Sequence, residues 1–299
     1  MKVAVNTPTG NIGRGLCERL LNAGVELVLL ARSPEKVEHL ADRGAVVYKG
    51  DLEDADFVVN ATKNIDVLFW LTPPNYATDD LRGHQNVLAD IVVRAVNENN
   101  IPRVIDLSSV GAHLSEGTGP IAGLGDVERK LEQTDAQVTH LRPGFFMENY
   151  FMSAETIASQ NAVFLPMEGS AKMAMIATDD IAKVAAERIL DKKWSDRTVI
   201  ELVGPSDVTF ENAAKTIGDA LGREVNHVTT TLAQTRDALT GMGVPSSTAD
   251  LFLEMYGAFN SGSITLESPG SEKVGTTTFR SFAEQSFVPA LTAMGDAKG

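Results

Sequence analysis

The sequence predicts an α/β fold built on a doubly wound parallel sheet, and two observations support this. Short apolar stretches have the composition of buried strands, at residues 3–5, 25–31, 45–48, 66–71 and 103–107. Stretches with helical periodicity separate them, at residues 14–21, 34–40, 57–62 and 81–97. Apolar strands that alternate with amphipathic helices form a parallel sheet covered by helices on both faces.

The second half of the chain is less regular and predicts a smaller α+β domain. We expect helices at residues 125–133, 181–190, 210–221, 232–239, 247–256 and 279–293. We expect strands at residues 138–142, 163–166, 172–176, 199–202 and 225–230, and a loop at 261–277. Thr178–Asp180 and Thr209 are the expected caps of the helices that follow them. The predicted division is residues 1–150 and 151–299, with some later elements returning to the main sheet.

The composition excludes several classes of protein. Lys and Arg number 26 and Asp and Glu number 40, so the formal charge of −14 disfavours nucleic acid and anionic membrane surfaces. No apolar run has the length of a membrane span, and Met1 leads directly into the first strand, so we expect a cytoplasmic protein. Cys17 is the only cysteine and is expected in the core of the first helix.

A turn of small residues joins the first strand to the first helix. Strand, tight glycine turn and helix N-terminus are typical of a Rossmann-type site for a dinucleotide pyrophosphate. Gly10 would let the backbone approach the phosphates, and Gly13 would let the helix lie close to the strand. The pattern is Gly-x-x-Gly-x-x-Gly with Thr7 at its first position. The residues expected to bind the cofactor here are Thr7, Thr9, Gly10, Asn11, Ile12 and Gly13; the alternative is a turn without a ligand.

Distinctive residues also follow the other strands, where ligands of such sheets bind. No acidic residue follows the second strand; Arg32 stands there and could pair with a 2′-phosphate, which favours NADP(H) over NAD(H). The alternative is a solvated surface arginine. Asp51 and Leu52 could hold the adenine, although Asp51 could also cap the following helix. Further cofactor-binding residues expected at strand ends are Leu71, Thr72, Pro73, Pro143 and Phe145.

Several motifs resemble those of the NmrA-like branch of the atypical short-chain dehydrogenase/reductases, over nearly the full length. The matching stretches are Thr9–Gly13, Ala31–Ser33, Gly50–Leu52, Leu107–Gly111, Leu141–Asn149 and Asp179–Ala182. The resemblance implies a Rossmann domain with a smaller substrate domain, and NAD(P)(H) binding. The family includes NADPH-dependent quinone and azo-dye reductases, and also cofactor-sensing regulators that catalyse nothing.

One departure from related enzymes concerns the proton donor. Ordinary short-chain dehydrogenases use a Tyr-x-x-x-Lys pair, in which the tyrosine is the general acid. Lys130 matches the lysine, but Asp126 stands at the tyrosine position. Lys130 is therefore the one catalytic candidate, beside the nicotinamide ribose; the alternative is a solvated helix lysine.

The substrate side is expected to be formed by Ser109, His113, Phe146, Asn149 and Tyr150. The alternatives are a surface position for His113 and core packing for the aromatic residues. The five histidines have no partner at ligand spacing, so no metal site is expected.

These observations predict an NADPH-dependent oxidoreductase that transfers hydride to an electron-poor acceptor such as a quinone or azo compound. The expected partner is a small-molecule substrate, and the expected assembly is a homodimer. The alternative is a non-catalytic NADP(H)-sensing regulator that binds a protein partner. An epimerase or dehydratase acting on a nucleotide sugar ranks last, because the tyrosine is missing.

Overall fold

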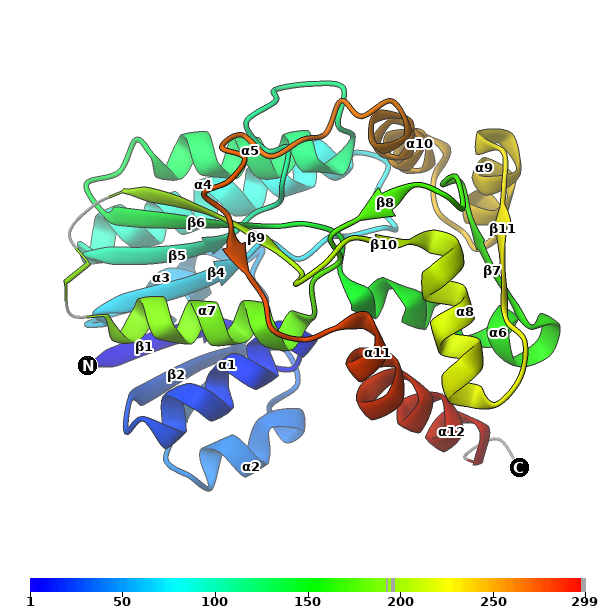
Figure 1. Cartoon of the computed structure of the whole chain (residues 1–299). Coiled ribbons are helices and arrows are strands. Elements are labelled where there is room, and N and C mark those ends of the chain that lie inside the picture. The colour runs from blue at the N-terminus through cyan, green and yellow to red at the C-terminus, as the bar shows by residue number, and fades with distance from the viewer. Residues whose placement is uncertain (192, 195–196, 297–299) are drawn as a thin grey trace.

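The protein is built around an eight-stranded sheet in which every neighbouring pair is parallel (Figure 1). The computed structural model describes residues 1–191, 193–194 and 197–296. The strand order is β12-β9-β6-β5-β4-β1-β2-β3. The strands are β1 (Lys2–Asn6), β2 (Glu26–Ala31), β3 (Val46–Lys49), β4 (Val67–Leu71), β5 (Arg103–Leu107), β6 (Gln137–Pro143), β9 (Thr198–Val203) and β12 (Lys273–Val274). The predicted doubly wound α/β fold is confirmed.

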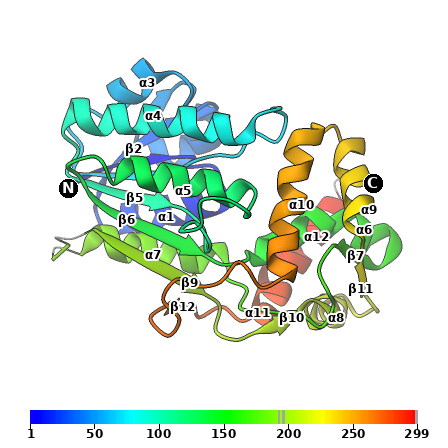
Figure 2. The ribbon, with the colours of Figure 1, turned by 90° about the horizontal axis from the view of Figure 1, so that it is seen from above.

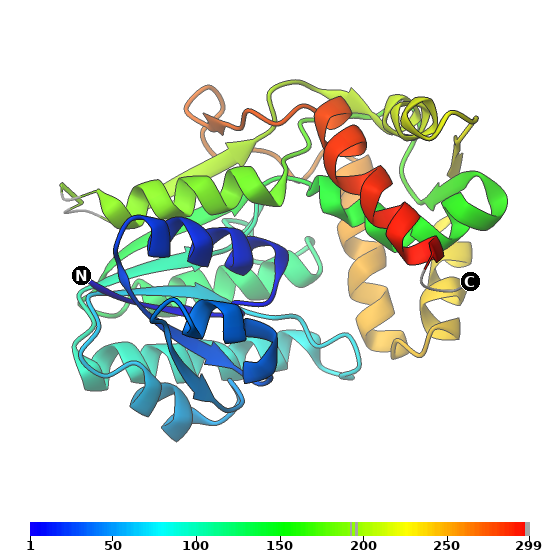
Figure 3. The same ribbon diagram turned by 90° about the horizontal axis from the view of Figure 1, so that it is seen from below.

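Helices cover both faces of this sheet, because successive strand residues point to opposite sides. Val3 and Val5 join the core beneath α1 (Asn11–Asn22) and α7 (Thr178–Leu190), which lie side by side in Figure 3. Ala4 joins the core on the other face, beneath α3 (Ala55–Ala61), α4 (Leu81–Asn99) and α5 (Pro120–Leu131). Figure 2 shows α4 and α5 together on that face. The short η1 (Pro34–Val37) and α2 (Glu38–Ala41) follow β2.

A second layer of structure lies beyond the carboxyl ends of the strands (Figure 1). It contains the parallel pair β7 (Ala162–Leu165) and β11 (Asn226–Thr229), and the antiparallel pair β8 (Lys172–Met173) and β10 (Val208–Thr209). Its helices are η2 (Met147–Ser153), α6 (Ala154–Gln160), α8 (Phe210–Leu221), α9 (Leu232–Gly241), α10 (Ser246–Asn260), α11 (Phe279–Phe282), η3 (Ala283–Phe287) and α12 (Val288–Asp296). A separate aromatic core holds it together, formed around Tyr150, Phe210, Phe282 and Phe287.

The chain passes between these two parts repeatedly. The helix α7 and the strands β9 and β12 come from the second half of the chain but belong to the main sheet and its covering layer. Gly15 of α1 lets α7 lie close, because a Cβ there would stand 3.2 Å from the Cβ of Ala182.

Several elements differ from the sequence-based expectation, among them η2, α6 and β10, which were not expected, and β8, which is shorter than expected. The helix α5 begins at Pro120 rather than residue 125, because proline suits the first helical position and Gly119 turns the chain before it with a φ of 56°. The two-residue β12 lies in the segment expected as a loop. The helix α7 begins at Thr178, and its cap is the distant carboxylate of Glu148.

Two further expectations concern single features. Cys17 is fully buried in the main core, as predicted, and burial raises the pKa of its thiol to about 12. Within the described residues, no helix combines the length and apolar character that crossing a lipid bilayer requires.

Candidate functional site: the carboxyl edge of the parallel sheet

The turn between β1 and α1 is tightly closed. The amide of Gly10 donates to the carbonyl of Thr7 at 3.1 Å, and Thr7 itself has a φ of 51°. A Cβ on Gly13 would stand only 2.2 Å from the Thr7 oxygen. Gly13 is therefore required by close packing between turn and helix, as the sequence predicted.

Gly10 differs from Gly13, because its surroundings are open. Its backbone is extended, and a Cβ there would meet only the Thr7 oxygen, at 3.5 Å. No side chain among the described residues caps the first turn of α1, so its leading N–H groups stay available to an anion. The buried Thr7 hydroxyl also has no hydrogen-bond partner among the described residues. This exposed, uncapped cradle fits a diphosphate.

Exposed charged residues follow β2 and β3. Arg32 is exposed and forms no ion pair with a described residue. The exposed Asp51 accepts a hydrogen bond from the amide of Glu53 at 3.0 Å. The cap of α3 is Asp54, which accepts from the amide of Phe57, so the alternative reading of Asp51 as that cap is wrong.

The end of β4 is held in place by a buried asparagine. The side chain of Asn6 donates to the carbonyl of Leu71 and accepts from its amide, both at 2.8 Å. The indole of Trp70 donates to the Thr72 hydroxyl at 3.1 Å. These bonds fix the direction in which Leu71, Thr72 and Pro73 leave the sheet.

The ends of β5 and β6 are joined by main-chain bonds. Val110 donates to the carbonyl of Pro143 at 3.1 Å, and the Ser109 hydroxyl donates to the carbonyl of Val110 at 3.2 Å. After Pro143 the chain places Phe145 edge-on to Phe210 in the aromatic core, while Phe146 packs against the main core. The loop therefore connects the two cores.

Asp126 and Lys130 of α5 both pair with residues of α4. Asp126 accepts from Arg82 and from Arg129, each at 2.6 Å. Burial alone would raise the pKa of Asp126, but the bonds from Arg82, Arg129 and Asn86 lower it well below its usual value. Asp126 is thus an ionised carboxylate without a proton to donate. The ammonium of Lys130 pairs with Asp90 of α4 at 2.6 Å. This contact does not favour the predicted role of Lys130 beside the cofactor, which stays a prediction.

The expected substrate residues differ in how far they are exposed. Ser109, His113 and Phe146 are half-buried near the strand ends, and Asn149 is exposed. Tyr150 is 1% exposed, with its ring edge-on to Phe279, so its hydroxyl does not reach the surface. Tyr150 is therefore a core residue, in line with the alternative expectation that the aromatic residues pack in the core.

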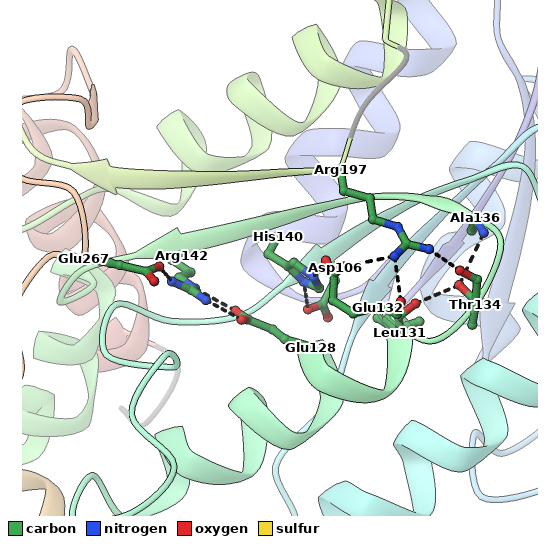
Figure 4. A network of polar contacts seen from close by, with 10 residues as sticks. All are labelled: Asp106, Glu128, Leu131, Glu132, Thr134, Ala136, His140, Arg142, Arg197 and Glu267. Atoms are coloured by element: carbon green, nitrogen blue, oxygen red, sulfur yellow. Dashed lines mark hydrogen bonds and ion pairs between the residues drawn. The ribbon is translucent and has the colours of Figure 1, made fainter.

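The sequence does not predict a buried polar network that lies beside these loops (Figure 4). His140 of β6 contacts Asp106 of β5 at 2.8 Å and Glu132 at 3.0 Å. Arg142 contacts Glu128 of α5 at 2.6 Å and also pairs with Glu267. The parallel register sets Asp106 opposite His140, a relation that sequence spacing does not reveal.

Asp106, Glu128 and His140 lie close enough together to be considered as metal ligands. Their ligand atoms, however, already bond to one another and to the guanidinium of Arg142, which repels a cation. Burial by itself would lower the pKa of His140, but hydrogen bonding and the charges of Asp106 and its neighbours raise it. The arrangement is that of a closed, charge-balanced network that supports the start of the Pro143 loop.

The comparisons with known proteins agree with this geometry. Residues 8–192 match the family described as NAD(P)H-binding. The chain is 28% identical over 248 residues to an NAD(P)H azoreductase of Xenophilus azovorans, covering 83% of this chain and 84% of that protein. It is 26% identical over 258 residues to quinone oxidoreductase 2 of Escherichia coli, covering 84% and 86%.

Solved structures have the same fold. Triphenylmethane reductase of Citrobacter sp., complexed with NADP(H), superposes with a TM-score of 0.79 at 21% identity, covering 96% of this chain and all of that one. NmrA, a negative transcriptional regulator in complex with NAD, superposes with a TM-score of 0.75 at 16% identity, covering 98% and 97%. The match of residues 8–192 shows that the chain belongs to the NAD(P)H-binding family, and the chain has the same fold as NmrA.

Proposed function

We propose that the protein is an NADPH-dependent oxidoreductase that reduces an electron-poor acceptor such as a quinone or an azo compound. The observation that carries the proposal is the uncapped glycine cradle at the β1–α1 turn, at the edge where parallel sheets bind their ligands. The azoreductase and quinone oxidoreductase named above support this choice of acceptor.

The residues of the chain have positioning roles in this reaction. The open backbone at Gly10 and the first N–H groups of α1 would hold the diphosphate, and Leu71, Thr72 and Phe145 would flank the nicotinamide. When bound, the reduced nicotinamide supplies the hydride. The protein would hold donor and acceptor in contact and exclude water, which supplies much of the rate enhancement when both are correctly oriented.

The cofactor preference rests on Arg32. Its guanidinium stands exposed after β2 without an ion pair among the described residues, so it is available for a 2′-phosphate. We propose NADP(H) as the cofactor on this basis, with Asp51 and Leu52 beside the adenine.

The test is oxidation of NADPH by the purified protein with a panel of quinones and azo dyes. We expect saturable binding of NADPH and turnover well above the uncatalysed rate with at least one acceptor. Binding of NADPH without turnover of any acceptor would contradict the enzymatic proposal.

A second candidate is a non-catalytic NADP(H) sensor that binds a protein partner. The ion-paired Asp126 at the position of the missing tyrosine favours it, and so does the fold shared with a transcriptional regulator. Calorimetry with both redox forms of the cofactor separates the two: a sensor prefers one form and has no turnover.

The assembly and the compartment are expectations from the sequence. We propose a cytoplasmic homodimer that takes a small-molecule acceptor. Size-exclusion chromatography with light scattering tests the dimer, and cell fractionation tests the location.

A further inference from the structure

Two phenol side chains that come from distant parts of the chain lie at one face of α10, close to the loops that follow the strands. Tyr76 lies in the loop between β4 and α4, shortly after Thr72, and 48% of it is exposed. Its ring packs on Phe252 of α10, with ring centroids 5.3 Å apart. Tyr256 follows Phe252 by one helical turn, which places both on the same face of α10.

The meeting of loop and helix is fixed by hydrogen bonds. At the start of α10 the hydroxyls of Ser247 and Thr248 donate to the carbonyls of Asp79 and Thr78, both at 2.6 Å. The polypeptide that leaves β4 is therefore tied to α10 just after Tyr76, at Thr78 and Asp79. The position of Tyr76 is thus set by the fold and does not depend on chance surface packing.

The helix α10 also reaches the other strand ends. Met255 and Ala258 pack with Val110 and Ala112 of the loop after β5. Tyr256 packs at the border of the aromatic core that contains Phe145, after β6. One helix face thus stands next to the loops that follow β4, β5 and β6, where a reducible acceptor must lie to meet the nicotinamide.

Neither phenol hydroxyl has a hydrogen-bond partner among the described residues. Burial raises the pKa of Tyr76, and burial together with Tyr76 raises that of Tyr256, so both hydroxyls keep their protons at neutral pH. Both hydroxyls are therefore free to donate a hydrogen bond. The position at which ordinary short-chain dehydrogenases carry their tyrosine acid is here occupied by the ionised Asp126.

We propose that Tyr76 and Tyr256 contact the acceptor, donating hydrogen bonds to its electronegative atoms, and that Tyr76 supplies the proton that completes its reduction. This assignment rests on the proposed reductase function. The acceptor gains a hydride and becomes an anion. Its oxygen or nitrogen then takes the phenolic proton, forming an O–H or N–H bond and leaving tyrosinate. Water returns the proton to Tyr76 and leaves as hydroxide.

Such donors also select the acceptor. A planar aromatic acceptor would lie against the ring of Phe252, and its carbonyl or azo atoms would accept from the phenols. An apolar acceptor without such atoms would leave both hydroxyls unsatisfied and would bind less well.

The test compares Tyr76→Phe and Tyr256→Phe with the matched control Tyr48→Phe, in the full chain loaded with NADPH. Tyr48 lies on β3 at the far edge of the sheet and is also exposed. We expect Tyr76→Phe and Tyr256→Phe each to lower kcat/KM for a quinone about 10-fold, the usual worth of one hydrogen bond. The NADPH Kd stays constant, and Tyr48→Phe keeps the wild-type rate. Tyr76→Phe also loses the solvent deuterium isotope effect on kcat/KM, a readout that a structural role would not change.

A binding measurement tests the contact between the phenols and the acceptor independently of turnover. A planar quinone is titrated calorimetrically into protein loaded with NADP⁺, which needs no turnover. We expect about 10-fold weaker binding in Tyr76→Phe and Tyr256→Phe. Wild-type protein that binds the quinone but turns nothing over would overturn the reductase proposal and the proton transfer from Tyr76, while the binding role of the two phenols would be judged by the titration. Equal binding and equal kcat/KM in the two variants and the wild type would overturn the role of the phenols, as would no quinone binding by the wild type.

Discussion

At the residue scale, the two glycines of the β1–α1 turn have different tasks, which two alanine variants separate. Gly13→Ala puts a methyl group 2.2 Å from the Thr7 oxygen, and we expect it to lower the free energy of unfolding by about 1–3 kcal/mol. Gly10→Ala meets little in the folded protein, so we expect a loss below about 1 kcal/mol. The methyl of Gly10→Ala, however, stands where the diphosphate would lie, so the NADPH Kd should rise at least about 10-fold. Urea unfolding and fluorescence titration measure the two effects, and unchanged NADPH binding by Gly10→Ala would refute the cradle.

Arg32 provides a second residue-scale prediction, on cofactor choice. Replacing it with serine removes a charge-assisted bond to a 2′-phosphate, worth about 1.5–3 kcal/mol. We expect the Kd for NADPH to rise about 10- to 100-fold, while the Kd for NADH stays within about two-fold. Lys36→Ser, also exposed after β2, is the matched control. Equal weakening of both cofactors by Arg32→Ser would show that the guanidinium does not recognise the phosphate.

At the scale of elements, the contact of β5 with β6 carries a buried charge pair. His140→Gln would leave Asp106, itself 1% exposed, without its cation, and we expect a loss of about 3–5 kcal/mol in the free energy of unfolding. Glu132→Gln, at the more exposed end of the same contact, should cost less than about 1 kcal/mol. Urea unfolding at pH 6 measures both, and equal losses would contradict the difference in burial.

The raised pKa of His140 also predicts a pH dependence. A histidine whose pKa is higher in the folded protein than in the unfolded chain contributes stability that is complete below the unfolded value, about 6.5. That contribution is lost as the pH rises through the folded pKa. We therefore expect the stability of the wild type to decline as the pH rises above about 6.5. The His140→Gln variant should lack this slope, and an identical slope in both proteins would contradict the assignment.

The same elements show which features a sequence can reveal. The places of Gly10 and Gly13 in a βα turn, and of Arg32 after the second strand, were predictable, because turn chemistry is local and apolar runs identify the strands. The network of Asp106, Glu128 and His140 was not predictable, because the register of β5 and β6 sets Asp106 opposite His140 and the packing of α5 brings Glu128 to them. Likewise, Tyr76 and Tyr256 are far apart in the sequence, and only the contact of the loop after β4 with α10 brings them to one part of the molecule.

At the scale of the whole molecule, one carboxylate joins the two parts. Glu148 of η2 accepts two bonds at 3.0 Å from the amide of Thr178 and one at 2.6 Å from its hydroxyl, at the start of α7. From there Asp179 pairs with Arg19 of α1 at 2.7 Å. The helix that would bind the diphosphate is thus connected through α7 to the chain that carries Phe145 and Tyr150. Sequence patterns predict the cap of α7 among its own first residues, because a capping partner thirty positions away leaves no local sequence pattern.

This connection predicts that Glu148→Ala loosens the outer part more than the sheet. Loss of a helix cap costs about 0.5–2 kcal/mol, and here the cap also bridges two cores. We expect amide hydrogen exchange to quicken across η2 and the first turn of α7, while β1, β4 and β5 keep their protection, since local openings need less free energy than global unfolding. Glu148→Gln retains an acceptor and should behave nearly as the wild type. Glu155→Ala, an exposed acidic residue in the first turn of α6, is the control for charge removal. Uniformly faster exchange throughout the sheet in Glu148→Ala would mean that the carboxylate supports the whole fold and does not act as a link between its parts.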